Sequence, residues 1–595
     1  MSDGAGGAAL PSWDLEAIYA APAEWEADFR RLRPLAEAFA AYRGRLAESP
    51  EVLAAAIAAL DDFERLGDKV STYAHLRADE NTAHSGNRAR AERVSALFAE
   101  LSGLSAWFEP EVMAIPPATM TAFLASPALA FYRRSLEELL REREHTLSEP
   151  EERLLGVFSE VLSAPEHIYS LLNDADLSFG RITAGGRRIE VTHGNYRKLL
   201  ESPDRAVRRA AFRRMMTAYR NIRNTCSATL DAAVRAHVVN ARVRKYPSAL
   251  AASLADDNIP ETVYRGLIEA VHDRLGHLHR YCSFRRRVLE LDRLDMYDLS
   301  VPLEPEVRRE YAWDEAVATV RAALAPLGET YGEALELAFR QRWIDAPERK
   351  GKCSGAYSGG GYDTYPYLLL NFNGTLDDVF TLAHELGHSL HSYHTNRAQA
   401  YHYSHYGIFL AEVASTTNEI LLSEHLTAHA DDPAMRRYLI AHLLDELRGT
   451  IYRQTQFAEF ELDIHERSAA GEPLTPDLLD ECYYELNARY YGPELAKADP
   501  LIAAEWARIP HFYYDFYVFQ YATSMSAAIR LAAGLLSGDR AAREAYIGFL
   551  SAGDSADALD TLKRAGVDLS TPEPVTAALD YFGSLLDRLE AAQRT

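Results

Sequence analysis

The sequence predicts a mostly α-helical protein. Apolar residues recur at three- and four-residue spacing through runs rich in Ala, Leu, Glu and Arg, and β-branched residues are few in those runs. Strand-like patterns are confined to two short stretches of the chain. At 595 residues the chain is too long for one small core, so we expect about two to four structural units.

The predicted elements follow the chain in order. A helical pattern covers 13–116 and is interrupted at Pro116-Pro117, and a second covers 136–172. Two strand-like pieces around Gly185-Gly186 predict a hairpin, after which helical patterns dominate to the end. We therefore expect three segments: an N-terminal helical region at 1–115, a helical and hairpin segment at 116–200, and a long C-terminal region at 201–595.

Composition excludes several classes of function. The net charge of −24 argues against sequence-independent binding of nucleic acid and fits an anionic membrane surface poorly. The four cysteines lie far apart without a CxxC pair, which favours a reducing compartment over a disulfide scaffold or a zinc-thiolate site. The first residues lack the pattern of a signal peptide, and the apolar run at 52–60 is about half a membrane span. We expect a cytoplasmic protein with no nucleic-acid or membrane partner.

The second strand-like stretch lies at 351–374. Two strand-like segments, 355–358 and 367–372, flank three consecutive glycines. These glycines are not a phosphate-binding loop, because no Gly-Lys-Ser/Thr follows them. A small β-sheet next to the following helix is the better interpretation.

That helix carries the motif on which the functional prediction depends. The segment TLAHELGHSLHSYHTN at 381–396 contains HExxH, with His384 and His388 one turn apart on one face and Glu385 between them. A chain of this length shows HExxH by chance in roughly a few cases per hundred, so the pattern alone also fits a polar patch on a helix.

The start of the helix supports the metal-site hypothesis. Thr375 can cap the helix, with Asp378 three residues later as its reciprocal partner. Asp377 lies seven residues before His384 on the same face, where it can accept the imidazole N–H. Asp377 is explained equally well by the general preference for acidic residues in the first turn of a helix.

Zinc bound by two histidines needs one more protein ligand and leaves a fourth position for water. Two candidates continue the same helix. If His391, one turn past His388, were the third ligand, the three ligands would be spread along a straight helix and would close the tetrahedron badly. His394 nearly completes the metzincin pattern HExxHxxGxxH, but His391 stands where that pattern needs the Gly that turns the chain back.

The third candidate is Glu412. It lies in a new helical segment after the polar loop at 396–406, and an antiparallel helix would return its carboxylate to the two histidines. We favour Glu412 over His394. Glu419, seven residues further, lies on the same face of the helix and is a candidate to hydrogen-bond a metal ligand. It can equally be a solvent-exposed acid without a role at the site.

With these motifs in view, the sequence resembles the oligoendopeptidase F family and, more distantly, thimet oligopeptidase and neurolysin. The segments TLDDVFTLAHELGHSLHSYH and IFLAEVASTTNEILL carry the resemblance most specifically. Weaker matches extend it over most of the chain, at WDLEAIY, DDNIPETVY, YDLSVPL, SGAYS and YDFYVFQYATS. The resemblance implies that His384, His388 and Glu412 bind one Zn²⁺ per chain and that Glu385 is the general base.

The resemblance also changes the interpretation of RIPHFYYDFYVFQYATS. A helix opening at Pro510 would place His511, Tyr514, Tyr517 or Val518, and Tyr521 on one face, and such an aromatic stripe is usually core. In the family that the sequence resembles, Tyr514 and Tyr521 match paired tyrosines that reach the substrate, and His511 matches a nearby histidine. They are implied to hydrogen-bond the oxyanion of the reaction.

The implied fold is a two-lobed, neurolysin-like zincin oligopeptidase with a small β-sheet beside the HExxH helix and a deep central channel. The implied enzyme is a zinc-dependent endopeptidase that cuts internal bonds of short, unfolded peptides, with 201–595 as its catalytic domain. The strand at Gly355, Ala356 and Tyr357 is implied to hold the peptide as an added strand. A different zinc hydrolase, such as a metallocarboxypeptidase, and a non-catalytic helical binding protein are the alternatives. Both a monomer and a homo-oligomer stay open.

Overall fold

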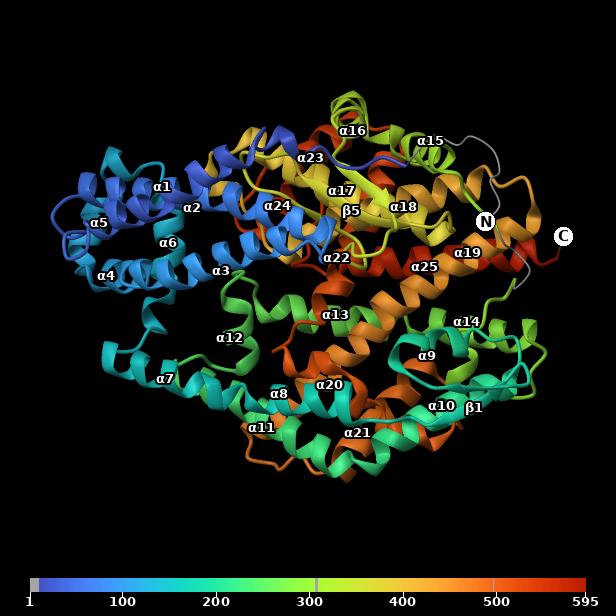
Figure 1. Cartoon of the computed structure of the whole chain (residues 1–595). Coiled ribbons are helices and arrows are strands. Elements are labelled where there is room, and N and C mark those ends of the chain that lie inside the picture. Colours follow the sequence, from blue (N-terminus) through green and yellow to red (C-terminus); the bar gives the residue numbers. More distant parts are fainter. Residues whose placement is uncertain (1–9, 305–308, 496, 595) are drawn as a thin grey trace. The chain divides into compact units, whose positions relative to one another are not determined.

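The computed structural model describes residues 10–304, 309–495 and 497–594, and these are mostly helical (Figure 1). The predicted fold class is therefore confirmed. The chain divides into two compact units, each built from three stretches that are separate in the sequence. The first unit contains Met1–Glu149, Arg309–Leu422 and Gly534–Asp557, and the second contains Pro150–Arg308, Ser423–Ala533 and Ala558–Thr595. The segment boundaries expected from the sequence stay a prediction.

The α-helices that begin in the first unit are α1 (Pro22–Ala40), α2 (Pro50–Glu80), α3 (Ser85–Ser105), α4 (Phe108–Ala114), α5 (Pro117–Leu124), α6 (Arg133–Arg141), α7 (Glu149–Leu162), α15 (Trp313–Leu324), α16 (Glu329–Arg340), α17 (Leu376–Ala398), α18 (Ile408–Ala428) and α23 (Arg540–Leu550). Those that begin in the second are α8 (Ala164–Leu171), α9 (His193–Leu200), α10 (Arg205–Asn221), α11 (Arg223–Val243), α12 (Ala249–Ala255), α13 (Glu261–Asp273), α14 (Leu275–Val288), α19 (Pro433–Leu447), α20 (Arg453–Ala469), α21 (Pro476–Tyr491), α22 (Phe519–Leu536), α24 (Ala558–Arg564) and α25 (Glu573–Ala592).

The N-terminal helices of the first unit pack against a small sheet. Trp25 of α1 and Tyr73 of α2 are buried in one hydrophobic core with Tyr367 and Leu369 of strand β5. The hydroxyl of Tyr367 also donates a hydrogen bond of 2.8 Å to the backbone carbonyl of Asp14. Because burial of apolar surface is the dominant favourable term in folding, these helices stabilise the strand that leads into the HExxH helix.

The small sheet has the strand order β3-β5-β4. Strand β3 (Ile344–Pro347) pairs parallel with β5 (Tyr367–Phe372), and β4 (Tyr357–Gly359) pairs antiparallel with β5. The sequence predicted β5 with the same bounds, but it placed the other strand at 355–358. Gly355 has a φ of +83°, a left-handed conformation that a strand excludes, so β4 begins two residues later.

Strand β3 was not predicted. It contains Asp345 and ends at Pro347, and both residue types are depleted in strands. Asp345 is fully buried, but Arg349 lies 2.7 Å and Lys352 lies 3.3 Å from its carboxylate. These cations offset the cost of burying the charge, and they come from the segment that follows the strand.

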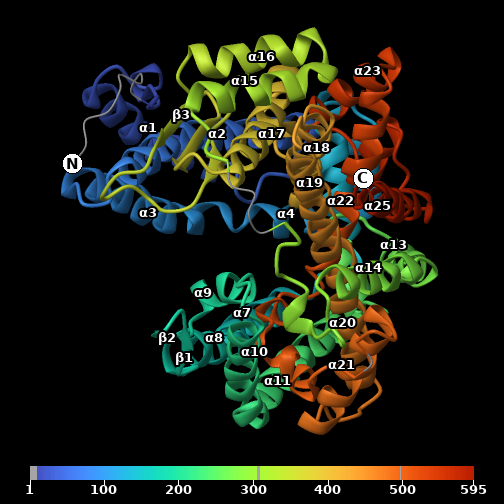
Figure 2. The same cartoon turned by 90° about the vertical axis from the view of Figure 1, so that its right-hand side faces the viewer.

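Strand β5 turns directly into α17. Gly374 has a φ of +81°, and a Cβ there would lie 2.9 Å from the carbonyl oxygen of Tyr311, so the turn requires glycine. Thr375 then caps the helix: its hydroxyl accepts the N–H of Asp378 at 3.2 Å, and the Asp378 carboxylate accepts the N–H of Thr375 at 2.8 Å. This is the capping box predicted from the sequence. Helices α15 and α16 pack beside α17 (Figure 2).

In the second unit, β1 (Arg181–Ala184) and β2 (Arg187–Glu190) form the predicted hairpin. Gly185 and Gly186 have φ values of +57° and +76°. Two left-handed residues in a two-residue loop define the turn that matches the natural twist of a hairpin, and glycine adopts it without steric cost.

The predicted helix from Pro510 through Tyr521 is wrong. The chain instead forms a short 3₁₀-helix, η10 (Pro510–Tyr513), followed by a turn, and α22 begins only at Phe519. His511 therefore lies in η10 and Tyr521 in α22, and Tyr514 lies between these elements.

The physical reason is a tertiary contact. Asp515 and Phe516 have φ values of 47° and 63°, a conformation that costs about 1–3 kcal/mol for each such residue and that a continuous helix excludes. The N–H of Phe516 donates instead to the buried carboxylate of Glu461, at 2.8 Å. Sequence periodicity does not reveal a partner 55 residues away.

Two further expectations concern the whole chain. Over the described ranges, no helix combines the length and the apolar character that a membrane span requires. The expectation about a signal peptide rests on the first sixteen residues, of which 1–9 lie outside those ranges. All four cysteines are free thiols.

Candidate metal centre

Helix α17 carries the HExxH motif with its three polar side chains in the predicted positions. His384 and His388 lie one turn apart, and their ring centroids are separated by 4.8 Å at an angle of 79°. Their Nε2 atoms are 3.1 Å apart. Two imidazole nitrogens that converge in this way can share one metal ion.

Helix α18 approaches α17 closely at Gly387. A Cβ on Gly387 would lie 2.5 Å from the Cα of Ser415, so the two backbones meet only because this residue has no side chain. The side-chain amide of Asn418 donates a 2.9 Å hydrogen bond to the backbone carbonyl of Ala383 and joins the helices a second time. The two contacts set the position of Glu412, which lies on the same stretch of α18.

Glu412 completes a group of three ligand atoms. One carboxylate oxygen lies 3.8 Å from His384 Nε2, and the other lies 3.9 Å from His388 Nε2. The hydroxyl of Ser415 lies 3.1 Å from the backbone carbonyl of Glu412 and 3.3 Å from its carboxylate, and it can donate to either. Ligand atoms of a tetrahedral zinc site are about 3.3 Å apart, so these side chains fit a metal ion with small adjustments.

Glu419 orients the first histidine. Its carboxylate lies 3.0 Å from His384 Nδ1, so Nδ1 carries a proton and the lone pair of Nε2 faces His388 and Glu412. Burial lowers the pKa of His384, but the hydrogen bond and charge of Glu419, together with nearby carboxylates, raise it to about 9, so a metal ion that binds Nε2 must displace a proton from it. Burial and the charge of His384 lower the pKa of His388 to about 3, which favours its neutral, metal-binding form.

Glu385 contacts both strand β4 and the charges of the ligand group. It is buried, and the backbone N–H of Ser358 donates a hydrogen bond to its carboxylate. Burial raises its pKa to about 7, and the nearby charges of Glu412 and Glu419 act in the same direction. A carboxyl group with a pKa near neutrality can take up and release a proton in one reaction cycle.

The other candidates on α17 lie apart from this group. His391 is buried and stacks on Tyr406, with ring centroids 3.8 Å apart. His394 is buried beside Tyr331, at a centroid distance of 6.2 Å, and its Nε2 has no hydrogen-bond partner among the described residues. Asp377 lies in the first turn, where its backbone carbonyl accepts a threonine hydroxyl. Its predicted support of His384 stays a prediction.

The predicted substrate-binding segment lies beside α17. Strand β4 is an edge strand, and Ser358 contacts Ser389 of α17 through a hydrogen bond of 2.7 Å between their hydroxyls. Tyr357 directs its hydroxyl to Asp79, at 2.7 Å, so its side chain anchors the strand to α2. Gly355 and Ala356 precede the strand, so peptide binding by this segment would use backbone groups.

The predicted oxyanion residues belong to the second unit. The ring of His511 lies 5.5 Å from that of Tyr514 and 6.1 Å from that of Tyr521, measured between centroids. Tyr514 is exposed, whereas Tyr521 lies at the start of α22 beside Tyr517. The three residues form one aromatic group, and their role in catalysis stays a prediction.

Sequence reasoning missed Gly387, Ser415 and Asn418, which position Glu412. A signal for two of them was present. Gly387 is a glycine inside a strong helical pattern, which usually has a packing reason. Asn418 is a polar residue in an apolar helix, where burial requires a hydrogen-bond partner.

The two histidines of the HExxH helix and the carboxylate from a second helix form a group that could hold a metal ion, with a buried glutamate next in sequence to the first histidine. Comparison with known proteins agrees. The family model described as "Peptidase family M3" matches residues 198–581, and a model described as "Oligopeptidase F" matches 111–179. The chain belongs to peptidase family M3, so it is a peptide hydrolase, and its family implies a catalytic metal ion.

Individual relatives cover almost the whole chain. Oligopeptidase PepF of Bacillus subtilis is 42% identical over 97% of this chain and 87% of its own length. A solved structure of oligoendopeptidase F from Enterococcus faecium is 36% identical, with a TM-score of 0.73 over 96% of this chain and 99% of that one. A solved chain from Chlamydophila abortus is 34% identical, with a TM-score of 0.94 and 98% coverage of both chains. The predicted resemblance is confirmed.

Proposed function

We propose that this protein is a zinc-dependent endopeptidase that hydrolyses internal bonds of short, unfolded peptides. The observation that carries the proposal is the convergence of His384, His388 and Glu412, whose ligand atoms all lie within 4.8 Å of one another. Two imidazoles and one carboxylate are a frequent ligand set of catalytic zinc, and they leave one position open. When bound, zinc supplies Lewis acidity that lowers the pKa of a water molecule and polarises a carbonyl group.

Each side chain around the ligands has a proposed task. Glu385 accepts the proton of the attacking water and passes it to the leaving amine, and its pKa of about 7 suits both transfers. Glu419 holds His384 in the tautomer that offers Nε2 to the metal. Tyr521, assisted by Tyr514 or His511, donates hydrogen bonds to the oxyanion that forms at the scissile carbonyl.

The substrate preference rests on two kinds of support. The relatives with closely similar sequences are named oligopeptidases and oligoendopeptidases, which favours short peptides and internal cleavage. Strand β4 lies at the edge of its sheet, a position at which an extended peptide can be added as a further strand, whereas a folded protein presents few extended segments. A cytoplasmic location is part of the proposal and is supported by the four free thiols.

The experiment combines product analysis with one substitution. A library of short peptides is incubated with the zinc-loaded enzyme, and mass spectrometry should find internal cleavage, with native globular proteins left intact. Glu385→Gln should retain its zinc and lose about 10²–10⁴-fold in turnover, whereas the exposed control Glu336→Gln should keep both. Trimming from one peptide end would instead indicate a carboxypeptidase, and near-normal turnover of zinc-loaded Glu385→Gln would contradict the assigned base.

A further inference from the structure

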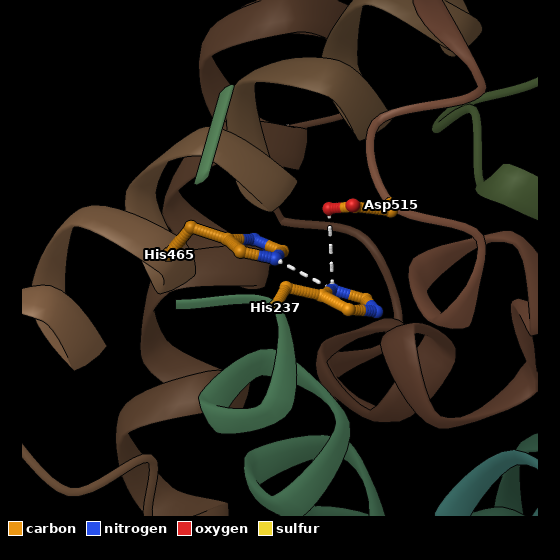
Figure 3. Close-up of side chains that lie close together, drawn as sticks. All are labelled: His237, His465 and Asp515. Atoms are coloured by element: carbon orange, nitrogen blue, oxygen red, sulfur yellow. Dashed lines mark hydrogen bonds and ion pairs between the residues drawn. The ribbon is translucent and has the colours of Figure 1, made fainter. Parts of the chain in front are cut away.

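A second group of potential metal ligands lies in the second unit. His237 of α11, His465 of α20 and Asp515, in the turn between η10 and α22, converge on one point (Figure 3). His237 Nδ1 lies 3.1 Å from His465 Nε2 and 3.3 Å from Asp515 Oδ1. Like the group at His384, it offers two imidazole nitrogens and one carboxylate oxygen within 4.8 Å of one another. Within the described part of the chain, these two groups alone meet that criterion.

The distances match a metal site. Two ligands that each bind zinc tetrahedrally at 2.0–2.1 Å are about 3.3 Å apart. Both separations measured from His237 Nδ1 are within about 0.3 Å of that value. His237 and Asp515 are partly exposed, so an ion can enter from solvent and water can complete its coordination.

The surroundings of two of the ligands also fit a metal site. His465 Nδ1 lies 2.8 Å from the backbone carbonyl of Glu461, so it carries the proton and its Nε2 offers a lone pair to the group. Asp515 Oδ1 is buried and has no hydrogen-bond partner among the described residues. A buried acceptor without a donor is costly, and a cation would satisfy it.

The backbone aims the carboxylate at the histidines. Asp515 and Phe516 both adopt left-handed conformations, with φ values of 47° and 63°. The Phe516 N–H donates to Glu461 Oε1 at 2.8 Å, and the hydroxyl of Ser253 donates to the Asp515 carbonyl at 2.5 Å. This strained turn directly follows Tyr514, whose side chain is exposed. A ligand that fixes the conformation of the turn therefore also fixes the backbone of Tyr514.

We propose that His237, His465 and Asp515 bind a second divalent transition-metal ion, of the zinc type, that holds the turn between η10 and α22. Imidazole ligands favour Zn²⁺ and its first-row neighbours over Mg²⁺ and Ca²⁺, which prefer oxygen. The ion joins α11 and α20 to the turn and is separate from the ion expected at His384. It has a structural role, since none of its ligands belongs to the catalytic group.

The experiment counts zinc in the whole protein and in four variants. Each is dialysed against a buffer in which a chelator holds free Zn²⁺ at a low, fixed concentration, and zinc per chain is measured by elemental analysis. Asp515→Asn is the decisive variant, because asparagine keeps the shape and tolerates the left-handed backbone but is a far weaker ligand. His237→Gln is a second variant at a partly exposed position. Asp463→Asn, which removes a carboxylate of α20 that pairs with Arg467, is the control.

The expected result is two zinc ions per chain in the unchanged protein and in Asp463→Asn, and one in Asp515→Asn and in His237→Gln. Glu412→Ala should keep one zinc ion, which separates this site from the catalytic one. Amide hydrogen exchange at residues 514–518 should slow when Zn²⁺ is added to Glu412→Ala. The proposal is overturned if Asp515→Asn keeps both ions, or if Glu412→Ala binds none.

Discussion

The close approach of α17 and α18 makes Gly387→Ala a sensitive test of how the centre is built. The added Cβ would lie 2.5 Å from the Cα of Ser415, whereas ordinary van der Waals contact begins at 3.4 Å, a shortfall of 0.9 Å (3.4 − 2.5). Backbone atoms must move by that amount, and overpacking of this kind costs about 1–3 kcal/mol. The gain in helix propensity from Gly to Ala offsets about 1 kcal/mol. We expect a net loss of up to about 2 kcal/mol in the free energy of unfolding.

The same displacement of α18 should weaken metal binding. Glu412 lies one turn before Ser415, so displacement of α18 carries its carboxylate away from His384 and His388 by a comparable distance. We expect the zinc concentration needed to restore activity after chelation to rise about 10–100-fold. The control is Gly332→Ala in α16, where a Cβ meets no atom within 4 Å and should stabilise the helix. Urea unfolding and zinc reactivation are measured on both variants, and equal behaviour of the two would refute the packing argument.

Two further substitutions test the residues around the ligands. Glu419→Gln removes the charge that holds the His384 tautomer, so zinc affinity should fall about 10–100-fold while the fold is retained. If a chelator titration finds unchanged zinc affinity, Glu419 does not support the metal site. Tyr521→Phe deletes a hydroxyl proposed to stabilise the oxyanion, so turnover should fall about 10²–10³-fold with zinc content unchanged. The neighbouring Tyr517→Phe is its control, and equal turnover in the two variants would speak against the assigned donor.

Local features of the fold were predictable from the sequence. The capping box of Thr375 and Asp378 and the Gly185-Gly186 hairpin involve neighbours within a few residues, so the pattern contains all the necessary information. The bounds of β5 were predictable for the same reason, because an apolar run of six residues is flanked by turn residues.

Features that depend on distant partners were not predictable. Strand β3 requires Arg349 and Lys352 to offset the buried Asp345, and the break after Tyr514 requires Glu461 from another helix. The position of Glu412 followed from spacing and ligand chemistry, but the depth at which α18 meets α17 depends on Gly387. That contact becomes visible only once the two helices are known to pack together.

The measurement that tests the central claim most directly compares the two candidates for the third ligand. Glu412→Ala and His394→Ala are purified side by side, dialysed against a mild chelator and assayed for zinc per chain and peptide hydrolysis. Glu412 lies beside both histidines, whereas His394 stacks near Tyr331, so Glu412→Ala should lose one zinc equivalent and nearly all activity while His394→Ala keeps both. Loss of zinc and activity in His394→Ala, with both retained in Glu412→Ala, would contradict the proposed metal centre.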